Sequence, residues 1–106
     1  MQEPVYAVAH IDVKDYDTYL AEYGLPVFEQ FVAAGAEVLA ATSEATTLEG
    51  EPLGNWTVIV KFPSADAASN WYQSEEYAPL KQMRVERLSR TGTTMLVPGF
   101  DPDILG

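Results

Sequence analysis

Apolar and polar residues alternate near the start of the chain in a way that is typical of a β-strand. Every second residue from Val5 to Val13 is apolar, and the positions between them are mixed and include His10 and Asp12. Successive side chains of a strand point to opposite faces of the sheet. The segment therefore predicts a central strand with one apolar face and one face that carries polar groups.

The pattern changes to helical spacing after Asp15, which we expect to cap a helix. Large apolar and aromatic residues then recur three or four positions apart as far as Val32. Gly24-Leu25-Pro26 interrupts them, and Pro26 fits the first turn of a second helical segment, where its missing N–H is not needed. We predict a kinked or two-part helix that ends near Gly35.

Two further strands and a hairpin loop are expected in the middle of the chain. Residues 37–48 carry small and β-branched side chains without helical spacing, and residues 49–54 are dense in turn formers. From Asn55 to Phe62 the alternation returns, with Thr57 and Lys61 on the more polar face. These segments predict a hairpin of two strands.

The last third of the chain predicts two helices and a strand. Ser64 stands where an N-cap is expected, and Ala68, Trp71 and Tyr72 follow at helical spacing. A break at Pro79 begins a short helix over residues 79–89, and residues 91–97 read as a final strand before a polar tail.

The predicted order of elements, β-α-β-β-α-(α)-β, is that of the α+β, ferredoxin-like split βαβ fold. Right-handed crossovers would place both main helices on one face of a four-stranded antiparallel sheet in the order 4-1-3-2. With 106 residues, the chain suits a single domain over residues 1–106, because two separate cores would each be too small.

The segment from Trp56 to Tyr77 also carries a resemblance. It joins a Phe62-Pro63-Ser64 corner to the pair Trp71-Tyr72 and to the turn Ser74-x-Glu76-Tyr77. This combination resembles the domain-of-unknown-function family 1330, small proteins of the dimeric α/β-barrel type. The resemblance implies a homodimer in which two sheets face each other with the helices outside, and it implies no particular activity.

The predicted sheet independently indicates that a partner covers one of its faces. Helices on one face leave the other face bare, and that face would include Val8 and Ile59. A second copy of the chain would cover it, and we predict a homodimer. The alternative is a monomer whose second face is covered by the C-terminal tail.

Composition limits the partners. Sixteen acidic and six basic residues give a formal net charge of −10, which repels phosphate backbones and anionic membrane surfaces. We therefore expect neither nucleic acid nor a membrane as a partner. No segment is apolar over the roughly 18 residues that cross a bilayer, and the first residues make a poor signal peptide, so a soluble, cytoplasmic protein is expected.

Residue types limit the chemistry as well. The chain has no cysteine and a single histidine, which excludes disulfides, thiolate catalysis and cysteine-bound metals. No calcium loop, zinc-binding helix, phosphate-binding glycine loop or nucleophilic serine elbow is present in the sequence. We expect no metal site and no cofactor.

A first group of candidate residues lies on the polar face of the strands. His10 and Asp12, with Thr57 and Lys61 on the neighbouring strand, would supply a titratable imidazole among a carboxylate, a hydroxyl and an ammonium group. In an enzyme, His10 would be the acid or base and Asp12 its orienting partner or a second acid or base. The alternative is that these polar residues only fix the pairing of strands or subunits.

A second group is aromatic, and a third is basic. Tyr19, Tyr23 and Tyr72 could orient a planar ligand in a cleft between helices and sheet, although rings of this kind more often fill the core.

Arg84 belongs to a run that holds four of the six basic residues and could anchor a carboxylate or phosphate. Its alternative role is an ion pair with one of the nearby glutamates, Glu75, Glu76 or Glu86.

Together these features favour a small homodimer that binds a small organic molecule and has no established catalytic activity. The alternative is a cofactor-independent enzyme of the monooxygenase, isomerase or decarboxylase type that acts on a small aromatic or carboxylated compound. That alternative rests on analogy with other proteins of the resembled fold.

Overall fold

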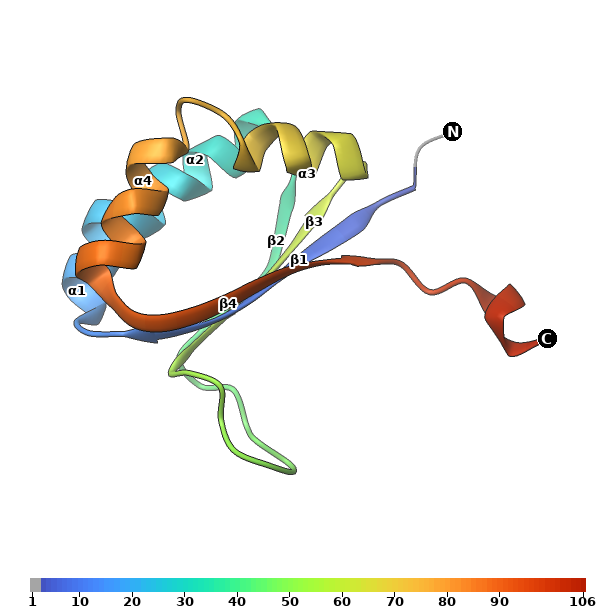
Figure 1. Ribbon diagram of the computed structural model, residues 1–106, viewed down its shortest axis with the longest axis horizontal. Coiled ribbons are helices and arrows are strands. Elements are labelled where there is room, and N and C mark those ends of the chain that lie inside the picture. Colours follow the sequence, from blue (N-terminus) through green and yellow to red (C-terminus); the bar gives the residue numbers. More distant parts are fainter. Residues whose placement is uncertain (1–2) are drawn as a thin grey trace.

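A four-stranded antiparallel sheet carries all the longer helices on one of its faces (Figure 1). The computed structural model describes residues 3–106. The elements, in chain order, are β1 (Val5–Val13), α1 (Tyr16–Tyr19), the π-helical turn η1 (Leu20–Gly24), α2 (Leu25–Ala33), β2 (Glu37–Thr42), β3 (Trp56–Phe62), α3 (Ala65–Tyr72), α4 (Ala78–Met83), a second π-helical turn η2 (Arg84–Leu88), β4 (Ser89–Pro98) and the 3₁₀ turn η3 (Pro102–Leu105).

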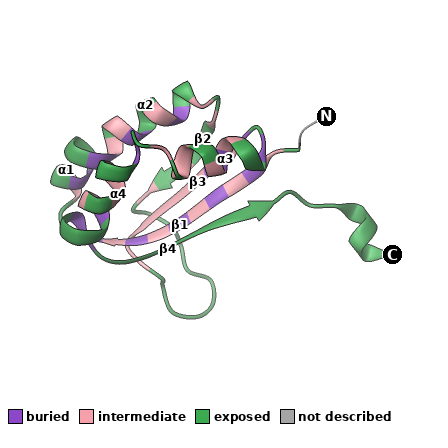
Figure 2. Cartoon of the chain, turned by 45° about the horizontal axis from the view of Figure 1, so that its top comes forward, coloured by how far each residue is buried: buried purple, intermediate pink, exposed green. Residues whose placement is uncertain are grey.

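The strands lie in the order β2-β3-β1-β4, which confirms the predicted antiparallel sheet and its order. β1 is central, and His10 pairs with Thr57 of β3 on one side and with Thr93 of β4 on the other. The alternation along β1 is regular, because every second residue from Val5 is buried against the helices (Figure 2). Its helix-facing side belongs to the core, and its other side belongs to what we call the open face of the sheet.

The core lies between the sheet and the helices. Phe62 and Ala68 are fully buried, and Tyr19, Val60 and Tyr77 are nearly so. Rings from three helices and β3 meet there; the Trp71 ring centroid lies 4.9 Å from that of Phe31 and 5.5 Å from that of Phe62. Aromatic packing therefore holds α2 and α3 on the sheet.

The first helical stretch is in two parts, as predicted, but the chain stays helical between them. The π-helical turn η1 joins α1 to α2, and Pro26 lies in the first turn of α2. The stretch ends at Gly35, which has a φ of 75° and is followed by a bond of 2.9 Å from Ala36 N–H to the Phe31 carbonyl. A left-handed glycine with this bond is a common helix end.

Asp15 does not cap α1 through its side chain. It occupies the N-cap position with an extended backbone, but its carboxylate accepts a hydrogen bond of 2.6 Å from the Thr18 hydroxyl instead of from a backbone N–H. The prediction of a capping side chain was therefore wrong. Ser64 behaves as predicted, because its hydroxyl accepts from the backbone N–H of Ala67 at 3.0 Å.

The second strand is shorter than predicted, since β2 ends at Thr42 and residues 43–55 form a loop. Asn55 closes this loop through its side chain. Its amide accepts a bond of 2.7 Å from Val13 N–H and donates one of 2.9 Å to the Val13 carbonyl. The Asn55 side chain thus pairs with the last residue of β1 directly before β3 begins, and it fixes the end of the loop there.

The C-terminal tail points away from the body of the molecule (Figure 1). Its apolar residues Phe100, Ile104 and Leu105 are each more than 70% exposed. The alternative of a tail folded back over the open face of the same chain is therefore wrong. Among residues 3–106, no helix has the length and apolar character needed to cross a membrane.

Candidate functional site

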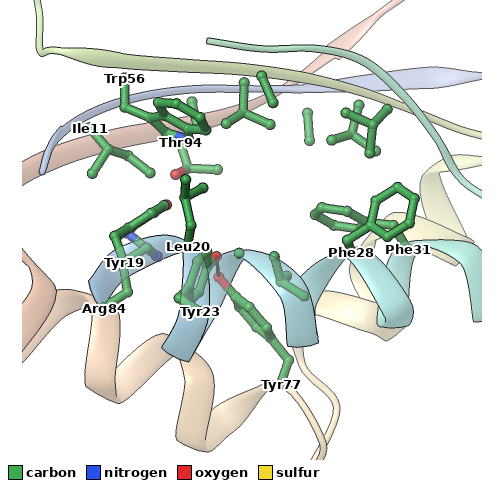
Figure 3. Close-up of a pocket in the computed structure, with 18 of the residues that line it drawn as sticks. Ile11, Tyr19, Leu20, Tyr23, Phe28, Phe31, Trp56, Tyr77, Arg84 and Thr94 are labelled. Atoms are coloured by element: carbon green, nitrogen blue, oxygen red, sulfur yellow. Dashed lines mark hydrogen bonds between the residues drawn. The ribbon is translucent and has the colours of Figure 1, made fainter. Parts of the chain in front are cut away.

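A cavity of about 210 Å³ lies between the helices and the helix-facing side of the sheet (Figure 3). All four strands contribute to its floor, and the helical stretch from α1 to α2 contributes its opposite wall. Apolar and aromatic side chains dominate the lining, and they include Ile11, Val27, Phe28, Phe31, Trp56, Val58 and Trp71. The cavity has the apolar, ring-lined character of sites that hold small organic molecules.

Most of the polar part of the cavity comes from Tyr19, Tyr23, Tyr77 and Arg84, and Thr94 of β4 adds a hydroxyl. The hydroxyl oxygens of Tyr23 and Tyr77 lie 2.7 Å apart and share a hydrogen bond (Figure 3). The Arg84 guanidinium carbon lies 5.7 Å from the centre of the Tyr23 ring, and the Tyr19 and Tyr23 ring centroids are 5.1 Å apart. One cation and three phenol groups are therefore gathered in one place.

Arg84 is unusual because it is buried without a carboxylate partner among residues 3–106. Its exposed fraction is 6%, and its Nε atom is buried without a hydrogen-bond partner. The ion pairs within residues 3–106 join Arg87 to Glu22 at 3.5 Å and Arg90 to Asp12 at 3.0 Å. The alternative role for Arg84, an ion pair with a nearby glutamate, is thus not what the described part of the chain shows.

The local fold explains how Arg84 comes to lie there. It opens the π-helical turn η2, and its carbonyl accepts a hydrogen bond of 2.7 Å from the Ser89 hydroxyl at the start of β4. Tyr77 precedes it by seven residues, which is two helical turns, so both side chains leave the same side of the helical stretch. The sequence spacing thus places Tyr77 and Arg84 together in the cavity.

Burial determines the ionisation of the polar groups. Burial raises the pKa of the Tyr19 phenol and raises that of Tyr23 well above its ordinary value, so both stay neutral and able to donate a hydrogen bond. Burial lowers the pKa of Arg84, but Tyr23, Tyr77 and Tyr19 together outweigh it and the pKa is raised. At neutral pH the cavity holds one positive charge among neutral phenols.

The predicted tyrosines divide between two places. Tyr19 and Tyr23 line the cavity, whereas Tyr72 does not, and Lys81 lies over its ring with the ammonium nitrogen 4.5 Å from the ring centre. The sequence prediction did not select Tyr77 as a site residue. The sequence feature that could have identified Tyr77 is the Ser74-x-Glu76-Tyr77 turn. In the structure, the Ser74 hydroxyl accepts a hydrogen bond of 3.1 Å from Tyr77 N–H and fixes the start of α4.

The polar strand residues lie on the open face, with the sheet between them and the cavity. His10 Nδ1 is 3.5 Å from the Thr57 hydroxyl, so these two predicted neighbours do meet. Asp12 instead bonds to Arg90 at 3.0 Å. Lys61 pairs with Tyr6, four residues along β3 from Thr57, and is separated from His10. His10 does not line the cavity that contains Arg84.

The donor set does not suggest a metal. Within residues 3–106, no cluster of three or more histidine, aspartate and glutamate side chains is placed to hold a metal ion. The polar part of the cavity offers a guanidinium and phenols, which are groups that bind anions and hydrogen-bond acceptors.

The sheet order and the helices on one face define a ferredoxin-like α+β protein with a cavity between its two layers. Within that class, the family "Domain of unknown function (DUF1330)" matches residues 4–100, and the chain belongs to this family. Among curated proteins, none matches the sequence significantly.

Solved structures support the fold. A protein of unknown function from Rhodopseudomonas palustris superposes with a TM-score of 0.71 at 16% identity, over 96% of this chain and 86% of that one. A protein from Bacteroides fragilis, described as dimeric and ferredoxin-like, gives 0.62 at 10% identity over 92% and 98% of the two chains. A candidate antibiotic biosynthesis monooxygenase from Nitrosomonas europaea gives 0.61 at 9% identity over 96% and 95%. At these identities the similarity concerns the fold alone.

Proposed function

We propose that this protein binds a small, largely apolar organic molecule in the cavity between its helices and its sheet. The observation that carries the proposal is the cavity itself, about 210 Å³ and lined mostly by apolar and aromatic side chains. A dry apolar cavity of about 150 Å³ is enough to bind benzene. The space therefore suits a molecule of one ring with a short substituent.

The two tryptophans of the chain make this proposal testable, because Trp56 and Trp71 both line the cavity. Titration with the neutral probe 3-phenylpropanamide should change their fluorescence in a saturable way. Phenyl rings absorb little where tryptophan is excited selectively, so the probe itself should not interfere.

A matched pair of variants locates the binding. Ala41 lines the cavity, whereas its neighbour Ala40 pairs with Ile59 and lies on the other face of the sheet. Ala41→Phe should fill the cavity and weaken binding of the probe by at least about tenfold, and Ala40→Phe should leave it unchanged. Saturable binding that both variants retain would contradict the proposal.

We propose further that the protein is a homodimer whose subunits cover each other's open faces. Val8 lies between Ile59 and Met95 on neighbouring strands and forms an apolar row across that face. Met95 is 47% exposed in the single chain, and Val97 is 39% exposed. The family membership and the dimeric neighbour from Bacteroides fragilis support this assembly. A cytoplasmic location remains a prediction from the sequence.

A second candidate function is cofactor-independent catalysis on a small aromatic or carboxylated compound. The half-buried His10, with Thr57 at 3.5 Å, and fold neighbours named as candidate monooxygenases support it. His10 would be the acid or base, and Asp12 would contribute from the same strand. If the candidate holds, His10→Ala should abolish turnover of an aromatic compound that binds on the open face, whereas Thr93→Ala on the adjacent strand should not. Unchanged turnover in His10→Ala would overturn it.

A further inference from the structure

Arg84 gives the cavity a feature that a purely apolar site would not need. The guanidinium lies among Tyr19, Tyr23 and Tyr77, and it has no carboxylate partner within the described residues. A buried charge without a counter-charge is unfavourable, and the remedy is an opposite charge placed beside it. The chain carries sixteen acidic residues, yet none within residues 3–106 forms an ion pair with this cation.

We infer that the ligand of the cavity is an aromatic monocarboxylate, with its carboxylate at Arg84 and its ring in the apolar part. This inference rests on the proposed function and specifies the class of the ligand. A guanidinium has paired donors in a plane that match the two oxygens of a carboxylate. Arg84 would thus be the positively charged partner of the ligand's carboxylate, and the carboxylate would supply the counter-charge for Arg84.

The arrangement of the lining supports a ligand with one anionic end. Figure 3 shows Arg84 and Tyr19 toward one end of the cavity and Phe28 and Phe31 toward the other. The Tyr23 hydroxyl is occupied by Tyr77, at 2.7 Å. The hydrogen bonds that tyrosine hydroxyls make within residues 3–106 involve Tyr16, Tyr23 and Tyr77, which leaves the Tyr19 hydroxyl for a ligand oxygen.

The charge balance favours a carboxylate over a phosphate monoester or a phenol. One guanidinium neutralises one negative charge, whereas a phosphate monoester carries close to two at neutral pH and would leave one uncompensated. A simple phenol titrates near pH 10, as tyrosine does, and would enter neutral. A carboxyl group is ionised at neutral pH and carries a single charge. The apolar remainder of the cavity then accommodates a ring.

The direct test compares two probes that differ in charge and share a shape. 3-Phenylpropanoate carries the carboxylate, and 3-phenylpropanamide is its neutral counterpart. Titrations monitored by the fluorescence of Trp56 and Trp71 should show the wild type binding the carboxylate about 10- to 100-fold more tightly than the amide, the range expected for a charge-assisted hydrogen bond. Equal affinities would overturn the inference and leave the proposed function standing, whereas no binding of either probe would overturn both.

Three variants assign the preference to Arg84. Arg84→Met should bring the two affinities to within about twofold by loss of carboxylate binding, and Arg84→Lys should retain part of the preference. Arg87→Met makes the same change of net charge at an exposed residue of the same turn, and it should keep the full preference. A preference that survives in Arg84→Met would overturn the inference. If Arg84→Met does not fold, the probe pair on the wild type and on Arg84→Lys still decides. The preference for the carboxylate should be full in the wild type and smaller in Arg84→Lys, and an undiminished preference in Arg84→Lys would overturn the inference.

Discussion

Buried phenols and one guanidinium form the polar end of the cavity, and their ionisation connects the site to the stability of the fold. Tyr19 is 2% exposed and Tyr23 is 7% exposed, and burial raises the pKa of both above that of an exposed tyrosine. The folded state therefore favours the neutral phenols. An unfolded chain loses its phenol protons near pH 10, where the buried groups still hold theirs.

This difference predicts alkaline destabilisation. The contribution of the two phenols is fully present below pH 10 and decreases as the pH rises from about 10 toward the raised pKa values. Urea midpoints measured between about pH 9 and about pH 11.5 should fall more steeply for the wild type than for Tyr19→Phe, which has no phenol to ionise. Identical slopes for wild type and Tyr19→Phe would contradict the assignment.

At the scale of the elements, Asn55 joins the loop of residues 43–55 to the end of β1. Its side chain exchanges two hydrogen bonds with the backbone of Val13, and its own carbonyl accepts a bond of 2.6 Å from the Tyr16 hydroxyl. The backbone of the loop also approaches β1 closely at Gly54, where a Cβ atom would lie 2.6 Å from the Ile11 carbonyl oxygen. The loop, β1 and the start of α1 are thus fixed at one point.

Removal of the Asn55 side chain should loosen this junction. Asn55→Ala leaves the Val13 N–H and carbonyl without their partners, and we expect a loss of about 2 kcal/mol in the free energy of unfolding. Asn70→Ala, at an exposed position in α3, is the matched control and should change stability by less than about 0.5 kcal/mol. Equal, small effects in urea unfolding would show that the loop is not anchored through this side chain.

The elements also show where sequence reasoning succeeds and where it stops. Alternation from Val5 to Val13 and a single plausible connectivity predict the sheet order, because one buried face constrains register strongly. The end of β2 at Thr42 and the closure of the following loop by the Asn55 side chain could not be predicted. Propensity describes neighbours in sequence, and Asn55 meets Val13 only in the folded chain.

The candidate site was predictable in part for the same reason. Tyr19, Tyr23 and Arg84 were selected from their residue types and helical spacing, and the fold brings all three into one cavity. The separation of His10 from Arg84 follows from the side of the sheet that each occupies. That Arg84 forms no ion pair with a carboxylate of the described residues could not be predicted, because the chain offers glutamates at positions that would suit one.

At the scale of the whole molecule, the chain is flat, with extents of 45 × 37 × 18 Å, as expected for one layer of helices on one sheet. β4 is exposed along nearly all of its length (Figure 2). An apolar row on the open face, with no helix above it, is the surface that the proposed dimer would bury.

A charged substitution on this face should therefore separate the subunits. Met95→Lys places an ammonium group in the apolar row beside Val8, and we expect its mass in solution to be that of one chain at concentrations where the wild type has twice that mass. Val85→Lys, at a position 55% exposed on the helical side, should remain a dimer. Light scattering coupled to size exclusion provides the masses, and a monomeric wild type would contradict the proposed assembly.

The central claim is that the cavity holds a small aromatic anion beside Arg84, and a crystal structure grown with 3-phenylpropanoate tests it most directly. The account predicts the ring between the helices and the sheet, with carboxylate oxygens about 2.7–3.0 Å from the Arg84 guanidinium. A compound bound instead on the open face beside His10, or a cavity that stays empty at saturating ligand, would contradict it.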